Sequence, residues 1–440
     1  MSNEQVAMSN ERKQSKLDEL IQQYCPDGIE FVPLWSVTIW DKKFNSVDKK
    51  KQPKVISYPY ILAKDMFALE QENGDVFLLS TGEQTGWTTE DIAGDFLCEG
   101  EVVSIPWGKS RKVSEVMKYY NGKFVTADNR IATSSDTSIL SNKYLYYWML
   151  SQGDLIDSFY RGSGLKHPSM KDVLDMKMPL PPLEVQSEIV RILDNFTELT
   201  AELTAELTAE LTARKKQYEF YRDKLLTFGD VQGGATGDVV WRTLGGICKK
   251  VVSGGTPQAG NPEYYGGTIP WLRTQEVGWK DITDTAVKIT EAGLNASSAK
   301  WIPENCVIVA MYGATAAKVA INKIPLTTNQ ACCNLEIDEK QALYRYVFHW
   351  LCKEYFSLKA LGQGSQSNIN AQTIKQYKIP VPSLEVQAKI VNVLDNFDAI
   401  CSDLKIGLPA EIEARQKQYE FYRDKLLTFK ESTNGQKETL

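Results

Sequence analysis

The stretch LPPLEVQSEIVRILDNF (180–196), continued by TELTAELTAELTAELTA (197–213) and RKKQYEFYRDKLLTF (214–228), predicts one long helix. Two prolines suit a helix start, and no Gly or Pro follows before Gly229. At about 1.5 Å per residue, a helix from Leu183 to Phe228 would be roughly 70 Å long, which exceeds a small domain. We therefore predict a strut with one apolar stripe. Its apolar residues recur every three or four positions, namely Ile189, Ile192, Leu193, Phe196, Leu199, Leu203, Leu207, Leu211, Tyr218, Leu225 and Phe228.

Both ends of this stretch occur again near the C-terminus. VPSLEVQAKIVNVLDNF (381–397) repeats the start, and RQKQYEFYRDKLLTF (415–429) repeats the end. Because a long internal repeat fixes the architecture, the chain is expected to consist of two similar halves related by a pseudo-twofold. The predicted fold is α+β, with two globular α/β domains separated by two long antiparallel coiled-coil helices.

The remaining segments complete this plan. KLDELIQQY (16–24) is predicted to be a short helix, and GIEFVPLWSV (28–37) aligns loosely with GDVVWRTLGG (237–246). A Gly-rich linker follows the first strut, and strands are expected within the first domain at 76–80, 101–107 and 122–127. The predicted boundaries are an N-terminal helix plus first domain (1–180), a spacer helix (181–228), a second domain (229–380), a second spacer helix (381–429) and a polar tail (430–440).

Composition bounds the function. The hydrophobic fraction of 42% suits globular domains, and no run of 18 apolar residues suggests a membrane span. The start lacks a signal-peptide core, and the eight cysteines form no CxxC pair, so a cytoplasmic protein with reduced thiols is expected. With two histidines in the chain, a zinc site or a histidine-based catalytic centre is not expected.

Two segments resemble catalytic motifs, but neither matches its motif fully. Trp107-Gly108-Lys109-Ser110 contains GKS, but Val103 stands where a P-loop requires its first glycine. Asn261-Pro262-Glu263-Tyr264 differs from the NPPY of amino-methyltransferases and is interpreted as a turn. The sequence therefore gives no positive sign of an active site.

Without catalytic motifs, the function that suits two domains on a long spacer is recognition of a long partner. The net charge is −6, yet basic residues cluster at 42–54 and 109–130, where solvated loops are the alternative interpretation. Gln and Asn can read adenine and Arg can read guanine, and Gly lets the backbone approach phosphate, so Gly-flanked loops at 162–167 and 364–368 are predicted to face nucleic acid. Ordinary surface turns are the alternative. The candidate residues are Lys42, Lys43, Lys109, Arg111, Lys112, Arg130, Lys166, His167, Arg273, Gln275, Lys318, Ser365, Gln366 and Asn368.

At this point the chain resembles the specificity subunit of a type I DNA restriction-modification enzyme. The duplicated LEVQ…LDNF and QYEFYRDKLLTF segments carry the resemblance, as do the TAEL tetrads, GGTPQAGNPEYYGGTIPWL (254–272) and GATAAKVAINKIPLTTNQA (313–331). The first domain lacks the GGTP…IPW block. The resemblance implies that each domain reads one half of a split double-stranded DNA site. It implies no cofactor in this chain: two modification subunits would bring S-adenosylmethionine, and restriction subunits would bring ATP and Mg²⁺.

The tetrads are predicted to be a spacer. Four helical residues advance about 6 Å and leave a net rotation of roughly 40°, close to that of one base pair of DNA. The alternative is a helix that tolerates changes in length. For the whole chain, the rival interpretations are a stand-alone methyltransferase-nuclease and a coiled-coil scaffold without DNA specificity. The spacer residues are Thr200, Leu203, Thr204, Leu207, Thr208 and Leu211.

Overall fold

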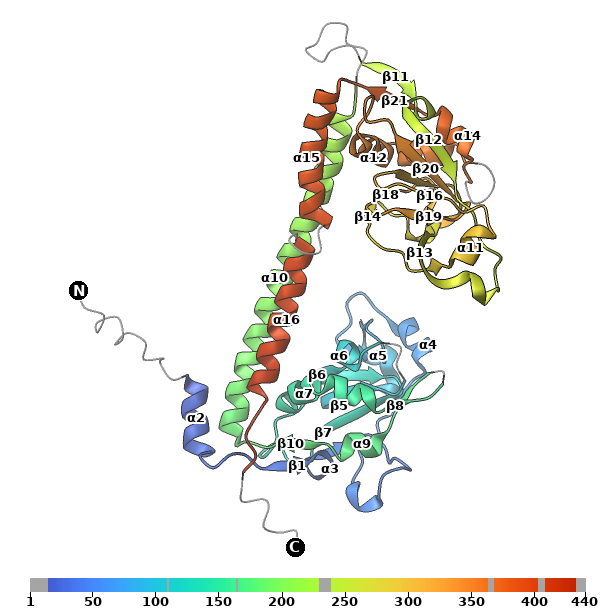
Figure 1. Cartoon of the computed structure of the whole chain (residues 1–440). Coiled ribbons are helices and arrows are strands. Elements are labelled where there is room, and N and C mark those ends of the chain that lie inside the picture. The colour runs from blue at the N-terminus through green and yellow to red at the C-terminus, as the bar shows by residue number, and fades with distance from the viewer. Residues whose placement is uncertain are drawn as a thin grey trace, which may run out of the picture. The chain divides into compact units, whose positions relative to one another are not determined.

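The computed structural model describes residues 15–108, 111–163, 165–228, 239–362, 368–402 and 408–432. The chain divides into two compact units, residues 1–204 with 413–440, and residues 205–412. Each unit combines a globular α/β domain with segments of long helices, and α10 (Leu183–Leu225) contributes to both (Figure 1). None of the helices in the described part of the chain combines the length and hydropathy needed to cross a bilayer.

The single long helix predicted after the prolines is confirmed as α10. Its first turns pack into the first domain, where Val185, Ile189 and Leu193 are fully buried. The apolar stripe is less regular than predicted, because Phe196 is 37% exposed and Leu199 is 61% exposed. Burial returns at Leu207, which is 8% exposed.

The second strut differs from the single helix predicted over 381–429. Its described residues form two helices, α15 (Leu384–Ser402) and α16 (Leu408–Leu426). Pro409 lies in the first turn of α16. A proline fits there but removes a hydrogen bond and clashes with the preceding turn inside a helix, so a helix can begin near Pro409 but cannot run straight through it.

The first domain is built on a mainly antiparallel sheet in the order β2-β7-β5-β6-β3-β4, in which β3 and β6 form the parallel pair. The predicted strands at 76–80, 101–107 and 122–127 are confirmed as β3, β5 and β6, and two helices, α7 and α8, follow the sheet. The elements are α2 (Lys16–Tyr24), β1 (Phe31–Pro33), α3 (Leu34–Val37), β2 (Thr38–Trp40), α4 (Ala63–Met66), β3 (Val76–Leu79), β4 (Gly86–Thr88), α5 (Glu90–Ala93), β5 (Cys98–Pro106), α6 (Val113–Val116), β6 (Lys118–Thr126), β7 (Asn129–Ser134), α7 (Asn142–Ser151), α8 (Gly153–Ser158), β8 (Tyr160–Arg161), β9 (His167–Pro168), α9 (Met170–Leu174) and β10 (Lys177–Pro179).

The second domain contains two sheets, in the orders β12-β20-β17-β18-β14 and β15-β13-β19-β16. Its buried strands β17 and β18 consist of small and β-branched residues, as expected for strands covered on both faces. The elements are β11 (Val240–Thr243), β12 (Cys248–Ser253), β13 (Tyr265–Leu272), η6 (Thr274–Glu276), β14 (Lys280–Ile282), β15 (Lys288–Ile289), α11 (Glu291–Asn295), β16 (Trp301–Ile302), β17 (Val307–Ala310), η7 (Gly313–Thr315), β18 (Val319–Asn322), β19 (Leu326–Thr328), β20 (Cys332–Ile337), α12 (Tyr344–Lys353), α13 (Tyr355–Ala360), α14 (Ala371–Gln376) and β21 (Lys378–Val381).

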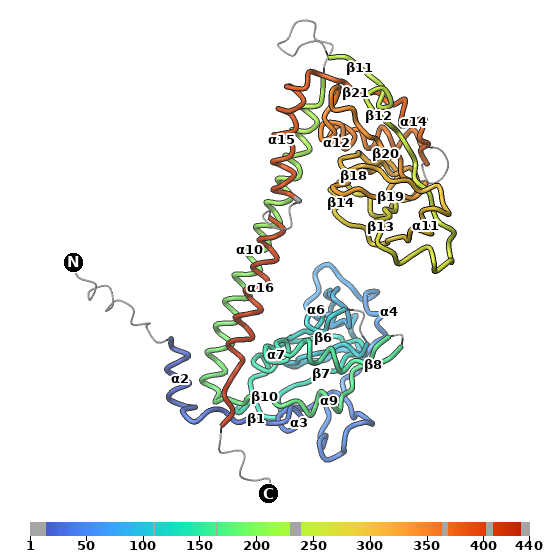
Figure 2. Tube along the Cα trace, viewed as in Figure 1, coloured from blue at the N-terminus to red at the C-terminus, as the bar shows by residue number. Residues whose placement is uncertain are grey.

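Each domain closes through one short antiparallel strand pair beside the start of its helix. In the first unit β1 pairs with β10, and in the second β11 pairs with β21 (Figure 2). The loose alignment of 28–37 with 237–246 is therefore confirmed, since these segments supply the equivalent strands β1 and β11.

A repeated glutamine fastens each domain to its helix. Gln186 and Gln387 follow the same LEV sequence and are fully buried. Gln186 Oε1 accepts the N–H of Ser141 at 2.9 Å, and Gln387 Oε1 accepts the N–H of Leu343 at 2.9 Å. Each amide nitrogen also donates to the carbonyl of the proline two residues before the helix, Pro181 at 2.7 Å and Pro382 at 2.8 Å. The glutamines thereby pair backbone groups at the start of the domain's main helix, α7 or α12.

The predicted polar tail begins with an ordered segment. Ile29 donates its N–H to Lys430 O at 2.9 Å, and Ser432 returns a hydrogen bond to Ile29 O at 2.9 Å. Gly28 has a φ of +100°, and a Cβ there would lie 2.8 Å from Lys430 O, so glycine is required at this crossing. The end of the chain is thus joined to the segment that leads into β1.

Candidate nucleic-acid interface

In the first unit, loops distant in sequence meet around Trp107, which directly follows β5. The His167 ring lies 4.0 Å from the Trp107 ring, and His167 Nδ1 lies 3.0 Å from Trp107 O. The Arg130 guanidinium, at the start of β7, lies 6.0 Å from the Trp107 ring and 5.7 Å from the ring of Phe44. Two predicted residues, His167 and Arg130, are therefore brought together by two aromatic residues that the sequence analysis did not select.

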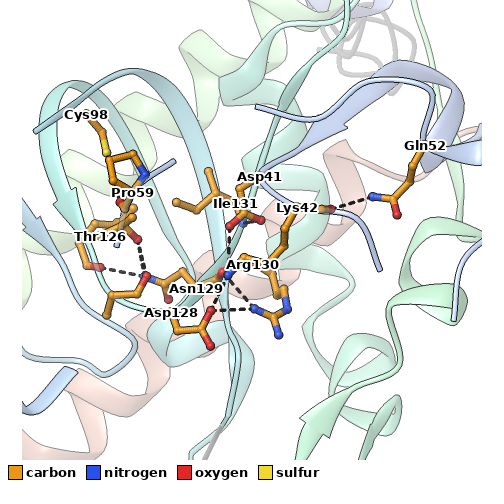
Figure 3. Close-up of polar contacts among 12 residues, drawn as sticks. Asp41, Lys42, Gln52, Pro59, Cys98, Thr126, Asp128, Asn129, Arg130 and Ile131 are labelled. Carbon is orange, nitrogen blue, oxygen red and sulfur yellow. Dashed lines mark hydrogen bonds and ion pairs between the residues drawn. The ribbon is translucent and has the colours of Figure 1, made fainter. Parts of the chain in front are cut away.

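Asp128 holds two of the predicted cations in place (Figure 3). Its Oδ1 accepts Arg130 Nη1 at 3.1 Å and Lys42 Nζ at 2.5 Å. The Arg130 side chain is 12% exposed, and that of Lys42 is 30% exposed. A guanidinium fixed by a carboxylate and flanked by rings loses little freedom on binding, which suits recognition of a base edge.

A second carboxylate, Asp41, lies next to this pair with its side chain 5% exposed. Its Oδ1 accepts the N–H of Ile131 at 3.1 Å, and Lys42 Nζ lies 3.7 Å from its Oδ2 (Figure 3). Burial raises the pKa of Asp41 to about 6, although Lys42 and the hydrogen bond from Ile131 oppose the rise. Asp41 is therefore ionised at neutral pH, and the two acids balance the two cations. Because this array is rigid and carries no net charge, it suits contacts with base edges better than non-specific binding of the phosphate backbone.

Other predicted cations of the first unit lie outside this array. Arg111 pairs with Glu83 at 2.8 Å, and Lys112 lies 3.6 Å from Asp154. All four of these side chains are more than half exposed, so the pairs contribute little stability and can be exchanged for phosphate contacts.

Lys43 and Lys166 are also exposed, and Lys109 lies outside the described residues. Lys118, part of the basic cluster at 109–130, has a different role. Its ammonium donates to Ser80 O at 3.0 Å and to Gly82 O, and burial lowers its pKa to about 8. Lys118 orders the loop after β3 and is not a free surface charge.

In the second unit, three predicted segments converge beyond β17. η6, which carries Gln275, is joined to η7 by a hydrogen bond from Thr315 Oγ1 to Thr274 O at 2.8 Å. Ile369, next to Asn368, donates its N–H to Met311 O at 2.9 Å. Gln275 and Asn368 are exposed there. Ser365 and Gln366 lie outside the described residues.

Arg273 and Tyr312 supply the remaining functional groups of this surface. Arg273 Nε is buried without a hydrogen-bond partner in the described part of the chain, and Glu276 lies 3.8 Å away. Tyr312, 42% exposed, was not predicted. Lys318 lies instead 4.8 Å from the ring of Trp279, a second exposed aromatic residue that sequence reasoning missed.

The two units share one relation between loop and strand. In the first unit, His167, just before α9, contacts the carbonyl of Trp107, which directly follows the central strand β5. In the second unit, Ile369, just before α14, contacts the carbonyl of Met311, which directly follows the central strand β17. Local sequence patterns do not reveal these two contacts, because the residues that make them are about sixty residues apart in the chain.

The tetrads place their leucines toward the buried side of α10. Leu207 is buried and Leu203 and Leu211 are half-buried, whereas Thr208 is exposed. Thr200 and Thr204 are half-buried, and Thr212 Oγ1 donates to Thr208 O at 2.9 Å. Removal of one tetrad would therefore keep leucine on the same face.

Comparisons with known proteins indicate the family of the chain. The family model for the type I restriction modification DNA specificity domain matches residues 41–213 and again 237–414. The Escherichia coli EcoR124I/EcoR124II specificity subunit is 37% identical over 314 residues, covering 68% of this chain and 74% of that protein. A candidate specificity subunit of Haemophilus influenzae is 28% identical over 353 residues, covering 77% of this chain and 86% of that one.

One solved structure shows the same fold. A chain from a study of complex assembly and conformational transition of the type I R-M system has a TM-score of 0.60 at 14% identity, covering 91% of this chain and 98% of that chain. The two matches to the specificity domain together span well over half of the sequence. The chain therefore belongs to the family of type I restriction modification DNA specificity domains.

Proposed function

We propose that this chain is the non-catalytic DNA-recognition subunit of a type I restriction-modification complex. Each globular domain reads one half of a bipartite double-stranded target, and the helices set the gap between the halves. The observation that carries this proposal is the twofold match to the specificity domain, one copy for each compact unit. We assign residues 30–180 and 229–380 to the two reading domains, and 181–228 and 381–429 to the spacer segments.

Base reading is assigned to four polar side chains. Arg130 in the first domain, and Arg273, Gln275 and Asn368 in the second, have the side chains that discriminate bases in the major groove. The exposed cations serve phosphate contacts, which position the protein without sequence information. They are Lys43, Arg111, Lys112 and Lys166.

Two modification subunits are the expected partners on the helices. Phe220 and Phe421 occupy the same position in the two QYEFYRDKLLTF copies and are 60% and 63% exposed. Large apolar side chains exposed at equivalent places support two copies of one partner surface. These subunits would bring S-adenosylmethionine, and restriction subunits would bring ATP and Mg²⁺. The assembly would act on DNA in the cytoplasm.

Replacement of one reading domain tests the proposal. Residues 30–180 are exchanged for the matching domain of another specificity subunit with a known target, and the complex with its modification subunits is assayed for methylation. One half-site should change, while the other half-site and the gap stay as they were. A change in both half-sites, or in neither, would overturn the assignment.

A further inference from the structure

The second unit contains a polar node, centred on a buried histidine, that connects its domain to two helices. It consists of Tyr218 on α10, Arg345 and His349 on α12, and Asp395 on α15. The His349 side chain is 0% exposed. Its Nε2 lies 2.7 Å from Asp395 Oδ1, and its Nδ1 lies 3.0 Å from the hydroxyl of Tyr218. One imidazole ring therefore contacts both helices at once.

The chemistry of the node follows from the burial of His349. Burial lowers the pKa of His349, so the ring is neutral at pH 7. Asp395 can only accept, which places the imidazole proton on Nε2 and makes the Tyr218 hydroxyl the donor to Nδ1. Although burial alone would raise the pKa of Asp395, hydrogen bonds from His349 and Arg345 lower it below its ordinary value.

Arg345 extends the node into the sheet. Its Nε and Nη2 donate to Asp395 Oδ1 at 2.9 Å and 2.5 Å, and its Nη1 donates to Asp281 Oδ1 of β14 at 3.2 Å. The geometry resembles a catalytic His–Asp pair, but a ring without exposed surface cannot meet a substrate. Its contacts are instead those of a rigid joint.

The first unit has a joint at the same positions with different side chains. Tyr147 on α7 donates to Asp194 Oδ1 at 2.7 Å, and Lys143 donates to Asp194 Oδ2 at 2.8 Å. Asp194 and Asp395 are the aspartates of the two LDNF copies. The second helix is reached indirectly there, through Thr197, whose hydroxyl lies 3.1 Å from that of Tyr419. Thr197 occupies the position of Asp398 in the second unit.

We infer that His349 is a positioning residue that sets the angle of the second reading domain on its helices, and thereby the length of DNA gap that the complex accepts. Every protein group in the joint is polar and directional, so it holds one orientation where apolar packing alone would permit small rotations. The inference rests on the proposed function. It assigns His349 no contact with DNA and no role in reading either half-site.

The test uses the complete complex with its modification subunits. The target is first identified by sequencing methylated DNA, and a library is then built with both half-sites and gaps one base pair shorter or longer. For His349→Phe, which removes both hydrogen bonds, the preference for the natural gap over its neighbours should fall about tenfold, because small misplacements of reacting groups are costly. Both half-sites should stay unchanged. Tyr218→Phe, which deletes one hydroxyl, should move the preference in the same direction and serves if His349→Phe does not fold.

Two controls separate positioning from stability. Ile308→Ala creates a cavity in β17 within a different buried cluster, so it should lower the unfolding temperature without altering the gap preference. The triple variant Arg345→Lys, His349→Tyr and Asp398→Thr recreates the polar side chains of the first unit and should restore the preference. A wild-type complex that methylates no bipartite site would overturn the proposed function and this inference with it. Wild-type selectivity that persists unchanged in both His349→Phe and Tyr218→Phe would overturn the inference alone.

Discussion

Replacement of Asp41 by asparagine isolates the cost of the buried charge next to the Arg130 array. Folding raises the pKa of Asp41 from 3.8 to about 6, chiefly because burial disfavours the ionised form. A folded pKa above the unfolded one means that the protonated acid favours folding. This stability is fully present below pH 3.8 and is lost as the pH rises through 6. At about 1.4 kcal/mol per pKa unit, the loss by pH 7.5 is about 3 kcal/mol.

The pH dependence is the sharper quantity. At pH 5 about 1.6 kcal/mol of this cost is already present, so about 1.4 kcal/mol more is lost between pH 5 and pH 7.5. Asparagine does not titrate, and its amide oxygen can still accept the N–H of Ile131. The advantage of Asp41→Asn over the wild type should therefore grow by about 1.4 kcal/mol between these pH values. Any difference that does not depend on pH, such as a change in packing, cancels from this comparison, and the attraction to Lys42 is already included in the folded pKa.

Hydrogen exchange provides the assay within the full chain. The opening free energy of β7 is measured by mass spectrometry for the wild type and Asp41→Asn, both at pH 5 and at pH 7.5, with intrinsic exchange rates corrected for pH. Asp128→Asn is the matched control, since that carboxylate is partly exposed and directly precedes the same strand. A difference between wild type and Asp41→Asn that stays constant with pH, or shrinks toward pH 7.5, would refute the reasoning.

Three further predictions follow from other parts of the chain. Gln387→Leu leaves the N–H of Leu343 and the carbonyl of Pro382 unpaired, and should destabilise the second unit by about 2–4 kcal/mol in chemical denaturation, whereas exposed Gln372→Leu should have little effect. Arg130→Lys keeps the charge but loses the planar fork, so binding assays should show relaxed discrimination at one guanine by about 1–3 kcal/mol with the salt dependence retained. Deletion of Thr204–Leu207 should keep both half-sites and shorten the methylated gap by about one base pair, and an active enzyme with the original gap would contradict the spacer role.

Regular local patterns were predictable from the sequence. The spacing of Ile189 and Leu193 after two prolines predicts α10, and the short helix over 16–24 is found with those same ends. The start of α16 was predictable as well, because a proline is accepted in the first turn of a helix and not in its interior, and Pro409 lies in that first turn.

The parts that depend on distant contacts could not be predicted. The repeated glutamines Gln186 and Gln387 are visible, but their partners are backbone N–H groups more than forty residues away. The sequence does not mark Trp107 and Phe44 as interface residues, since an aromatic residue beside a basic loop is equally typical of a hydrophobic core. Arg130 was selected for its charge, whereas its fixed geometry depends on Asp128 and on rings supplied by two other loops.

Methylome sequencing of the host tests the central claim most directly. Genomic DNA is compared between the wild type, a strain that lacks this gene, and the deletion strain complemented with the gene. The account predicts one bipartite motif, two short specific halves around a gap of fixed length, that is methylated in the wild type, lost in the deletion and restored by complementation. A methylome that is unchanged by the deletion, in a host that expresses the modification subunits, would contradict the claim that this chain selects the DNA target.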